Sequence, residues 1–472
     1  MKLYNTFTKT VDEFKTKEEN VVKMYTCGPT VYHFAHIGNL RTYIMEDVLE
    51  KYFRFAGYRV DRVMNITDVG HLTSDADTGE DKMLKGAKRE HKTVMEIADY
   101  YTKAFFKDCE ELNIRKPDTI VPATSCIDEF IKVVSALLDK GYAYIEGGNI
   151  YFDTSKDPSY GKLAGHQNGK DDLKVAVRGD VDEDTNKKNK NDFVLWFTKS
   201  KFEEQELKWD SPWGVGYPGW HIECSCISMK NLGEYLDIHC GGVDNIFPHH
   251  TNEIAQSEAY LGHEWCPQWF HVQHLNDVQG KMSKSKGDFL TVSLLKSKGY
   301  NPIAYRFFCL QSHYRKPLLF TFDNLDNAQS AYNKLYSKVS ALSFDGEVDE
   351  AVVNEMNEKF SSVMGNDLNT AQGITVLYDA LKLKTNDATK RAVINSFDSV
   401  LSLNLKDAKN EEVKQTTVEN GLSDDEINAL INERLEAKKA KNYALADQIR
   451  NDLKEKGIIL TDTPQGTTFT RT

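Results

Sequence analysis

An apolar strand, an amphipathic helix and a second strand are predicted within the first 66 residues. Residues 21–25 form a short apolar run that ends before Gly28-Pro29, a dipeptide that breaks regular structure. Apolar side chains recur at helical spacing over 41–55, and 58–66 alternates in the manner of a strand. Strand, helix and strand in this order predict a parallel, nucleotide-binding α/β fold, in which ligands bind at the carboxyl ends of the strands.

The stretch between the first strand and the helix carries two histidines, His33 and His36, followed by Asn39. We interpret it as a turn that leads into the helix. His36 and Asn39 should then lie at the helix N-terminus, where backbone amides favour phosphate. The carboxyl-end rule also places Cys27, after the first strand, and Thr67, after the second, near the same crevice.

A cationic loop is predicted far downstream, where residues 280–288 read GKMSKSKGD. Its lysines, Lys281, Lys284 and Lys286, cannot all be buried, and the bounding glycines let the backbone turn sharply. Such a loop suits a polyanion that is gripped briefly, above all a triphosphate. Taken alone, a stretch of this kind is more often a solvated lysine-rich turn.

Four residues in separate stretches offer ligand atoms to a metal ion: Cys27, Cys224, His249 and Glu253. His249 and Glu253 are four residues apart, so on a helix they would share a face. Thiolates, imidazole and carboxylate together make a zinc-like set. The sequence has no CxxC pair, however, and a helical His/Glu pair is more often a surface pair. The chemistry alone therefore leaves a metal site open.

Composition narrows the class of protein. The 472 residues are enough for about two to four domains, and eight cysteines in such a length predict free thiols or metal ligands. A net charge of −12 argues against non-specific coating of nucleic acid, although a local basic patch leaves tRNA possible. No apolar run reaches membrane-spanning length and no signal peptide is evident, so we expect a cytoplasmic protein without a membrane partner.

The rest of the chain alternates polar insertions with helical stretches. Residues 71–90 are polar and are expected to form an exposed insertion, and 123–202 a mixed insertion between two halves of the sheet domain. Strands are expected at 235–239 and 270–275. Helices are expected at 93–112, 127–140, 220–228, 323–343, 350–364, 370–383 and, behind a capping box at 423–426, at 427–441.

Two short motifs carry a resemblance to a known family. HIGN at 36–39 and KMSKS at 281–285 resemble the signatures of class I aminoacyl-tRNA synthetases. The blocks CGPT at 27–30, PGWHIECS at 218–225 and 247–253 look like the zinc-site blocks of cysteinyl-tRNA synthetases of bacterial type. Further similar blocks, in the same order, are NITD at 65–68, DFVLW at 192–196, SPWG at 211–214 and DTPQGTT at 462–468. The ordered set covers nearly the whole chain and is much more specific than any single block.

The resemblance implies an α/β class I synthetase fold. It consists of a Rossmann-like parallel-sheet catalytic domain with an inserted connective domain, an α-helical bundle and a small anticodon-binding domain. On this sequence the implied boundaries are 1–122 and 203–300 for the two catalytic halves, 123–202 for the insertion, 301–415 for the bundle and 416–472 for the last domain.

The resemblance also implies roles for individual residues. Catalysis is expected from His36, Asn39, Lys281 and Lys284, and ATP binding from the same four with His33, Gly38 and Asp244. The substrate cysteine is expected to meet Gly28, Thr67, Trp220 and His239. One Zn²⁺ is expected on Cys27, Cys224, His249 and Glu253. Contacts with tRNA are expected from Arg434, Lys438, Tyr443, Asp447 and Asp462.

The reaction implied is that of a cysteine–tRNA ligase. L-Cysteine is activated with ATP and Mg²⁺ to an adenylate, with loss of pyrophosphate, and is then transferred to the 3′ end of tRNA(Cys). Zinc would bind the substrate thiolate and so reject serine, which differs from cysteine only by oxygen for sulfur; Glu253 is the expected labile ligand. The resemblance further implies a monomer.

Two alternatives remain at this stage. One is a ligase that joins cysteine to an amino sugar, which resembles the family in its catalytic half but lacks the last domain. The presence of residues 423–472 argues against it. The other is a non-catalytic RNA-binding paralogue, which would be expected to have lost the histidines or the lysine loop; this chain has both.

Overall fold

The computed structural model describes residues 1–69, 83, 92–165, 184–199, 206–277, 280–281, 290–406, 408, 424–439, 442–455, 458–463 and 466–471. The chain divides into two compact units, Met1–Lys409 and Asn410–Thr472, which are treated separately below. The finer division into five parts remains a prediction. Within the described residues, no helix is both long and apolar enough to cross a membrane.

The first unit is built on a five-stranded sheet in the order β11-β10-β3-β4-β5, and every neighbouring pair in it is parallel. Its strands are β3 (Val21–Thr26), β4 (Arg59–Ile66), β5 (Thr119–Pro122), β10 (Ile238–Gly242) and β11 (Trp269–Val272). The chain adds β4 and β5 on one side of β3, and β10 and β11 on the other. The strand order therefore reverses between β3 and β10, the place where parallel sheets bind ligands. The predicted α/β fold is confirmed.

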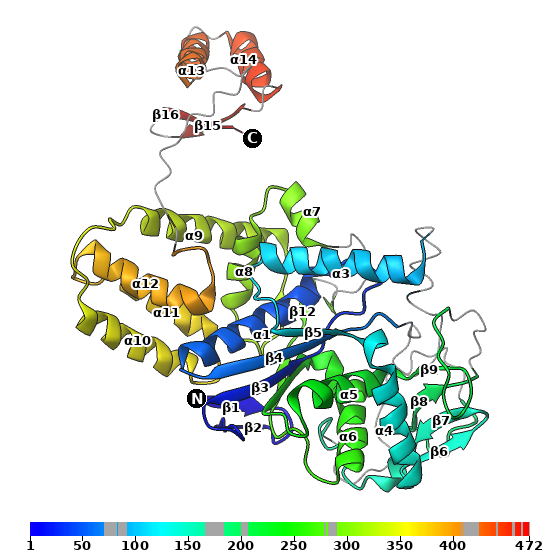
Figure 1. Cartoon of the computed structure of the whole chain (residues 1–472). Coiled ribbons are helices and arrows are strands. Elements are labelled where there is room, and N and C mark those ends of the chain that lie inside the picture. Colours follow the sequence, from blue (N-terminus) through cyan, green and yellow to red (C-terminus); the bar gives the residue numbers. More distant parts are fainter. Residues whose placement is uncertain are drawn as a thin grey trace. The chain divides into compact units, whose positions relative to one another are not determined.

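Helix α1 (Ile37–Phe55) connects β3 to β4 and covers one face of the sheet, whereas α5 (Trp220–Leu232) covers the other (Figure 1). α1 begins four residues earlier than the apolar spacing indicated, because His36 caps it: His36 Nδ1 accepts a hydrogen bond from the Gly38 backbone N–H at 3.0 Å. β4 does not follow the expected alternation, since from Val60 onward only Asp61 is not fully buried. A strand in the middle of a covered sheet has no solvent face.

The strand expected at 235–239 lies three residues later, at β10. Asp237 explains the shift, because its carboxylate accepts the backbone N–H groups of Lys17 and Lys23 at 2.7 Å each. Parallel pairing with β11 then extends through Gly241 and Gly242. The strand expected at 270–275 is divided between β11 and β12 (Leu275–Asp277).

In the chain, an antiparallel sheet and the helices α4 (Ile127–Asp139) and α5 come between β5 and β10, the two halves of the parallel sheet. The sheet has the order β6-β7-β8-β9, with bounds Ala143–Glu146, Asn149–Phe152, Phe193–Phe197 and Tyr217–Pro218. α4 packs against α5 and α6 (Thr251–Leu261) around a common apolar core. The exposed insertion expected at 71–90 lies outside the described residues, except for Met83. The Met83 side chain is fully buried, unlike the exposed surroundings expected for this segment.

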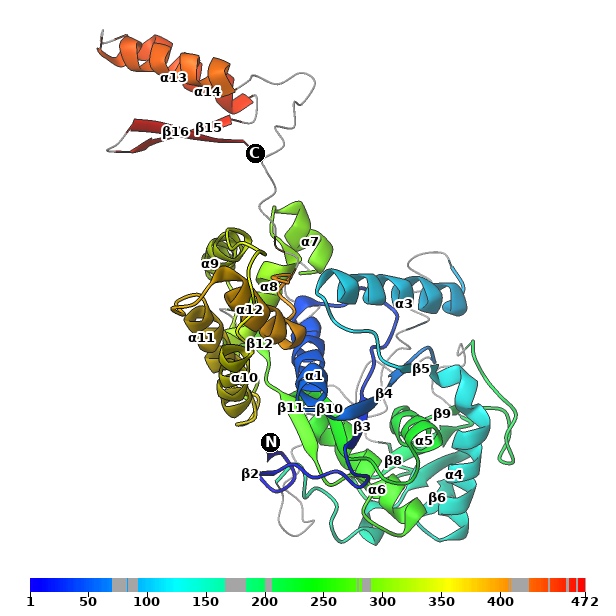
Figure 2. The ribbon, with the colours of Figure 1, turned by 60° about the vertical axis from the view of Figure 1, so that its left-hand side comes forward.

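Helices after residue 300 pack against α1 and share its hydrophobic core (Figure 2). They are α8 (Pro302–Leu310), α9 (Phe322–Ser340), α10 (Glu350–Met364), α11 (Thr370–Ala380) and α12 (Asp387–Leu401), of which α12 was not expected. The remaining elements of this unit are β1 (Lys2–Asn5), β2 (Thr10–Glu13), α3 (Val94–Glu111), α7 (Val292–Ser297), β13 (Gly280–Lys281) and β14 (Leu318–Leu319).

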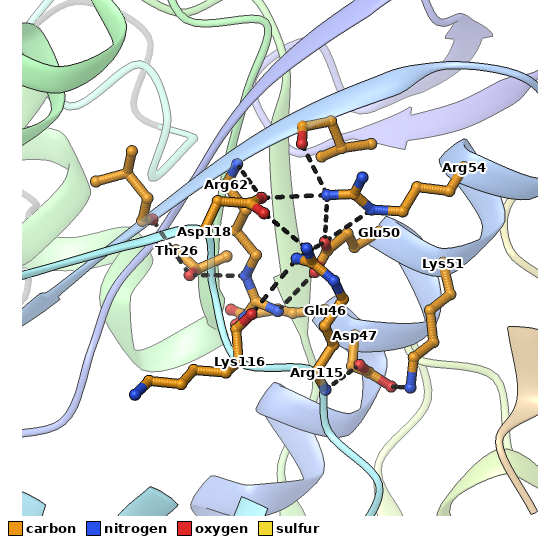
Figure 3. Close-up of polar contacts among 12 residues, drawn as sticks. Thr26, Glu46, Asp47, Glu50, Lys51, Arg54, Arg62, Arg115, Lys116 and Asp118 are labelled. Atoms are coloured by element: carbon orange, nitrogen blue, oxygen red, sulfur yellow. Dashed lines mark hydrogen bonds and ion pairs between the residues drawn. The ribbon is translucent and has the colours of Figure 1, made fainter.

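A network of buried charges fixes α1 to β4 and to the segment before β5 (Figure 3). Arg62 of β4 is fully buried and lies 3.4 Å from Glu46 and 3.2 Å from Glu50, both on α1. Glu50 also accepts hydrogen bonds from Arg54 and Arg115. We call Glu46, Glu50, Arg54, Arg62, Arg115 and Asp118 the arginine–carboxylate network.

The second unit is a small helical hairpin with a two-stranded antiparallel sheet. Its elements are α13 (Asp424–Lys439), α14 (Tyr443–Glu455), β15 (Ile458–Thr463) and β16 (Gly466–Arg471). Its core is aliphatic and includes Ile427, Ile431, Ile449 and Leu453.

Candidate active site and metal centre

A cavity of about 470 Å³ lies at the carboxyl ends of β3, β10 and β11, beside the reversal of strand order. It brings together many of the predicted ATP-binding residues. The lining includes Cys27, Gly28, His33, His36, Gly38, Asn39 and Asp244 on one set of segments, and Val272, Gln273, His274 and Leu275 on another. A polar cavity of this size at the switch point of a parallel sheet is the expected place for a nucleotide.

The first turn of α1 forms one wall of this cavity. His36, Gly38 and Asn39 lie there, and no acidic side chain occupies the turn to repel an anion. The positive end of the helix dipole at this start favours phosphate. Near the cavity, Asp244 Oδ1 lies 3.1 Å from His274 Nε2, and the His33 ring stacks on Tyr101 with ring centres 6.0 Å apart.

The lysine loop is only partly described. The backbone of Lys281 pairs in β13 with Asn276 of β12, and Lys284 lies outside the described residues. Leu290, the first described residue after the loop, is tied to α1, because the Ile37 N–H donates to the Leu290 carbonyl at 2.9 Å. The roles of both lysines remain predictions.

The four predicted metal ligands converge, although they come from different elements. Cys27 follows β3, Cys224 lies on α5, His249 lies in the short turn Ile246–His250, and Glu253 lies on α6. One ligand atom from each lies within 4.8 Å of the other three. The Cys27 and Cys224 sulfurs are 3.9 Å apart, Cys224 Sγ is 3.5 Å from His249 Nε2, and His249 Nε2 is 3.0 Å from Glu253 Oε1. We call these four residues the metal-ligand cluster.

The donor set and its spacing fit zinc. Two sulfurs each about 2.3 Å from a tetrahedral zinc ion lie about 3.8 Å apart, and a sulfur and a nitrogen ligand about 3.6 Å apart. The separations of 3.9 Å and 3.5 Å in this structure agree with that geometry. Glu253 Oε1 is fully buried and, although His249 Nε2 lies 3.0 Å away, it accepts no hydrogen bond of good geometry. A buried carboxylate oxygen without a donor is a suitable ligand for a cation.

The charges within the cluster also suit a cation. Burial opposes ionisation of Glu253, yet the neighbouring His239 and His249 lower its pKa to about 2. The pKa of the Cys224 thiol is lowered despite burial, because Cys27 and His249 donate hydrogen bonds to its thiolate. Burial and the nearby Cys224 raise the pKa of Cys27. The low pKa of Glu253 therefore favours its carboxylate form before any metal binds, and the neighbours of Cys224 make its thiol easier to deprotonate.

Sequence reasoning missed three histidines around this cluster. His221 Nδ1 lies 2.9 Å from His249 Nδ1, so the second nitrogen of His249 is held while Nε2 faces the cluster. His250 Nε2 lies 3.3 Å from the Cys27 sulfur, and His250 Nδ1 lies 2.8 Å from His271 Nε2. A second possible ligand set, Cys27, His239, His250 and Glu253, overlaps the first. In the sequence, only the adjacency of His250 to His249 pointed to this second ligand set.

Of the residues expected to meet cysteine, Trp220 and His239 contact members of the cluster. Thr67 is buried and its hydroxyl donates to Glu223 Oε2 at 2.9 Å, and the Trp220 ring lies 5.0 Å from the His249 ring. His239 is fully buried, with Nε2 2.8 Å from Glu253 Oε2.

Gly28 is the residue of this group that also lines the cavity. Its N–H donates to Asn65 Oδ1 at 2.7 Å, and a Cβ there would lie 1.6 Å from the Asn65 carbonyl oxygen, so only glycine fits. Cys27 thus belongs to both the cavity lining and the cluster, and Gly28 follows it in the cavity wall.

Two other cysteines lie outside both ligand sets. Cys226 Sγ donates to the Glu129 carbonyl at 3.8 Å, and Cys240 packs in the main hydrophobic core. In the second unit, Arg434 is buried and Lys438 is half-buried. Tyr443 and Asp447 lie on α14 and Asp462 on β15, but their side chains lie outside the described part. The tRNA roles of these five residues remain predictions.

Comparison with known proteins agrees with this architecture. Residues 13–330 match the family model of the catalytic domain of class I tRNA synthetases of type C. The chain is 45% identical to the cysteine–tRNA ligase of Treponema denticola, covering 99% of both chains, and 44% identical to that of Borreliella burgdorferi, covering 100% of this chain and 99% of the relative.

Among solved structures, the methionyl-tRNA synthetase of Mycobacterium tuberculosis bound by methionyl-adenylate superposes with a TM-score of 0.51 at 14% identity, covering 81% of this chain and 90% of that one. This likeness speaks for the fold alone. The sequence resemblance is confirmed by the full-length relatives: the chain belongs to the cysteine–tRNA ligase family of class I aminoacyl-tRNA synthetases.

Proposed function

We propose that the chain activates L-cysteine with ATP to cysteinyl-adenylate and pyrophosphate, and then transfers cysteine to the 3′ end of tRNA(Cys). The observation that carries this proposal is the adjacency of the two sites. Cys27 and Gly28 line the cavity at the switch point, and Cys27 is also a member of the metal-ligand cluster. A thiol held at the cluster would thus have its own carboxylate near a nucleotide in the cavity.

The activation step needs positioning more than proton transfer. The cysteine carboxylate is already ionised when it attacks the α-phosphate of ATP, so no general base is required. The start of α1, with His36 and Asn39, would bind phosphate oxygens and stabilise the charge that develops on them. Lys281 and Lys284 would pair with the departing pyrophosphate, and Mg²⁺ would accompany ATP.

Cys27, Cys224, His249 and Glu253 would hold Zn²⁺. When bound, zinc supplies a borderline-soft Lewis acid that favours a substrate thiolate over a hydroxyl. The chain's part is to hold the ligands deprotonated and in place, which the low pKa of Glu253 and the contact of His239 with its second oxygen support. Shape alone would separate cysteine from serine by only about 10- to 200-fold.

Transfer to tRNA would involve the second unit. Its small helical and β-hairpin fold, Asn410–Thr472, is the part that an amino-sugar ligase of this kind would lack. Arg434, Lys438, Tyr443, Asp447 and Asp462 stay candidates for contacts with the anticodon. Of these, Arg434 would have to leave its buried position to reach a base.

Charging of bulk tRNA tests the proposal. The protein is incubated with ATP, Mg²⁺ and labelled cysteine or serine, with and without a zinc chelator, and zinc is added back to one chelated sample. We expect cysteine-only charging that chelation abolishes and zinc restores. Adenylate formation without any charging of tRNA would instead favour the amino-sugar ligase. Absence of ATP turnover by zinc-loaded protein would refute a catalytic function.

A further inference from the structure

Arg41 is a fully buried cation directly behind the cavity wall. It lies on α1, two residues after Asn39, and its side chain is 0% exposed. Its guanidinium donates four hydrogen bonds, all to backbone carbonyls: Nη1 to Gln273 at 2.5 Å and His274 at 2.7 Å, and Nη2 to His313 at 3.4 Å and Lys316 at 2.8 Å.

The environment of Arg41 is unusual for a buried charge. Within the described residues, no carboxylate pairs with it, and its Nε has no hydrogen-bond partner. Burial lowers the pKa of its guanidinium. A buried cation held only by carbonyls is costly, because no opposite charge offsets the loss of hydration.

Two of the four carbonyls that Arg41 holds, those of Gln273 and His274, belong to residues that line the cavity. One wall is the start of α1 with His36, Gly38 and Asn39, and the other is the segment from Val272 to Leu275. The His274 side chain in turn contacts Asp244, the predicted ribose contact. Arg41 therefore ties the helix that carries His36, Gly38 and Asn39 to the backbone of Gln273 and His274.

We propose that Arg41 is a positioning residue for the activation step, which acts through the backbone of Gln273 and His274 rather than by touching ATP. The inference rests on the proposed function and deepens it. A planar guanidinium with several fixed donors can hold two carbonyls of one segment and two of another at once, which a lysine cannot. A misplacement of about 1 Å between reacting groups costs about 100-fold in rate.

A matched control lies elsewhere in the same unit. Arg391 is 3% exposed and likewise donates to carbonyls, those of Leu342, Ser340 and Ala408, but none of these residues lines the cavity. Arg391→Met reports what the loss of a buried, carbonyl-bound arginine does to the fold. Arg41→Met and Arg41→Lys report what it does to the cavity.

The test is cysteine-dependent exchange of pyrophosphate into ATP by the full-length, zinc-loaded protein. We expect Arg41→Met to lower kcat about 100-fold with KM for cysteine within about twofold of wild type, since the cluster is untouched. Arg41→Lys should recover part of the loss, and Arg391→Met should keep kcat within about twofold. Zinc content should stay at one per chain in all variants.

Two results would overturn the inference. One is a normal kcat in Arg41→Met or, if that variant does not fold, in Arg41→Lys. The other is an equal loss of kcat in Arg391→Met, which would mean that any damage to the fold suffices. Failure of the wild-type protein to exchange pyrophosphate would be distinct, because it would refute the proposed function itself and this inference with it.

Discussion

Two buried polar regions lie against the same sheet and differ in how their charges are arranged. The arginine–carboxylate network lies between α1 and β4, where Arg62 faces Glu46 and Glu50 (Figure 3). The metal-ligand cluster lies past the end of β3, where two thiols, an imidazole and a carboxylate face one another. In the network, arginines alternate with carboxyl groups; in the cluster, the convergent atoms are all electron donors.

The difference separates a structural region from a functional one. Buried charges that pair with each other need nothing further, and they hold the elements that carry them together. Convergent donors without a cation repel each other or stay protonated, so their spacing suits a bound positive ion. Burial alone does not distinguish the two regions, since Glu50 and Glu253 are both 0% exposed.

The largest effect is expected from Cys224→Ser in the cluster. Loss of a thiolate ligand should remove zinc and lower cysteine charging by more than about 100-fold, because even outer contacts of a metal site are worth about 10- to 100-fold. Metal content and charging rate are measured together. Cys226→Ser, two residues away on the same helix and outside both ligand sets, is the control and should keep zinc. Full charging by Cys224→Ser would contradict the zinc site.

In the network, Arg62→Met should lower the free energy of unfolding and leave the zinc content unchanged. It leaves the buried carboxylates of Glu46 and Glu50 without their shared partner, which destabilises by about 3 to 5 kcal/mol. Thermal unfolding measures the loss, and zinc content should stay at one per chain. Arg59→Met on the same strand breaks only exposed pairs with Asp61 and Glu18 and should cost about 0 to 1 kcal/mol. Equal losses of stability in Arg62→Met and Arg59→Met would show that the buried pairs stabilise the fold no more than the exposed ones do.

A smaller effect is expected from His239→Leu, which removes the contact to the second oxygen of Glu253. Zinc affinity, measured by competition with a chromogenic chelator, should fall about 10- to 100-fold, because this contact orients a ligand carboxylate. His263→Leu, half-buried beside Tyr235 and away from the cluster, should leave the affinity unchanged. Unchanged affinity in His239→Leu would show that Glu253 needs no such support.

The last prediction is a gradual effect, a pH dependence within the network. Burial raises the pKa of Glu46 to about 8, although Arg62 opposes the shift. A raised folded-state pKa gives stability that is complete below the unfolded pKa of about 4.5 and is lost as pH rises toward 8. The stability of Glu46→Gln relative to wild type should therefore increase by about 1 kcal/mol per pH unit from 5 to 8 and then level off. A flat difference in thermal midpoint over that range would contradict a neutral Glu46.

Local patterns predicted most of the elements and the ligand set. The apolar spacing of 41–55, the His249/Glu253 pair at helical distance and the ordered blocks each depend on residues close in sequence. These signals gave the α/β class and named Cys27, Cys224, His249 and Glu253, which the structure brings within 4.8 Å of one another. The bounds of β10 and the existence of α12 were missed, because a carboxylate from 237 and packing against α1 decide them.

The sequence by itself therefore determined which residue types were available and on which elements they lie. Only the tertiary structure decided what they do together. Cys27 and Cys224 are 197 residues apart, and Arg41 reaches carbonyls 232 to 275 residues away. Spacing along the chain carries no information about such pairs, since the parallel sheet joins segments through long crossovers. The helices on both faces of that sheet also bury β4, and with it Arg62, the centre of the network.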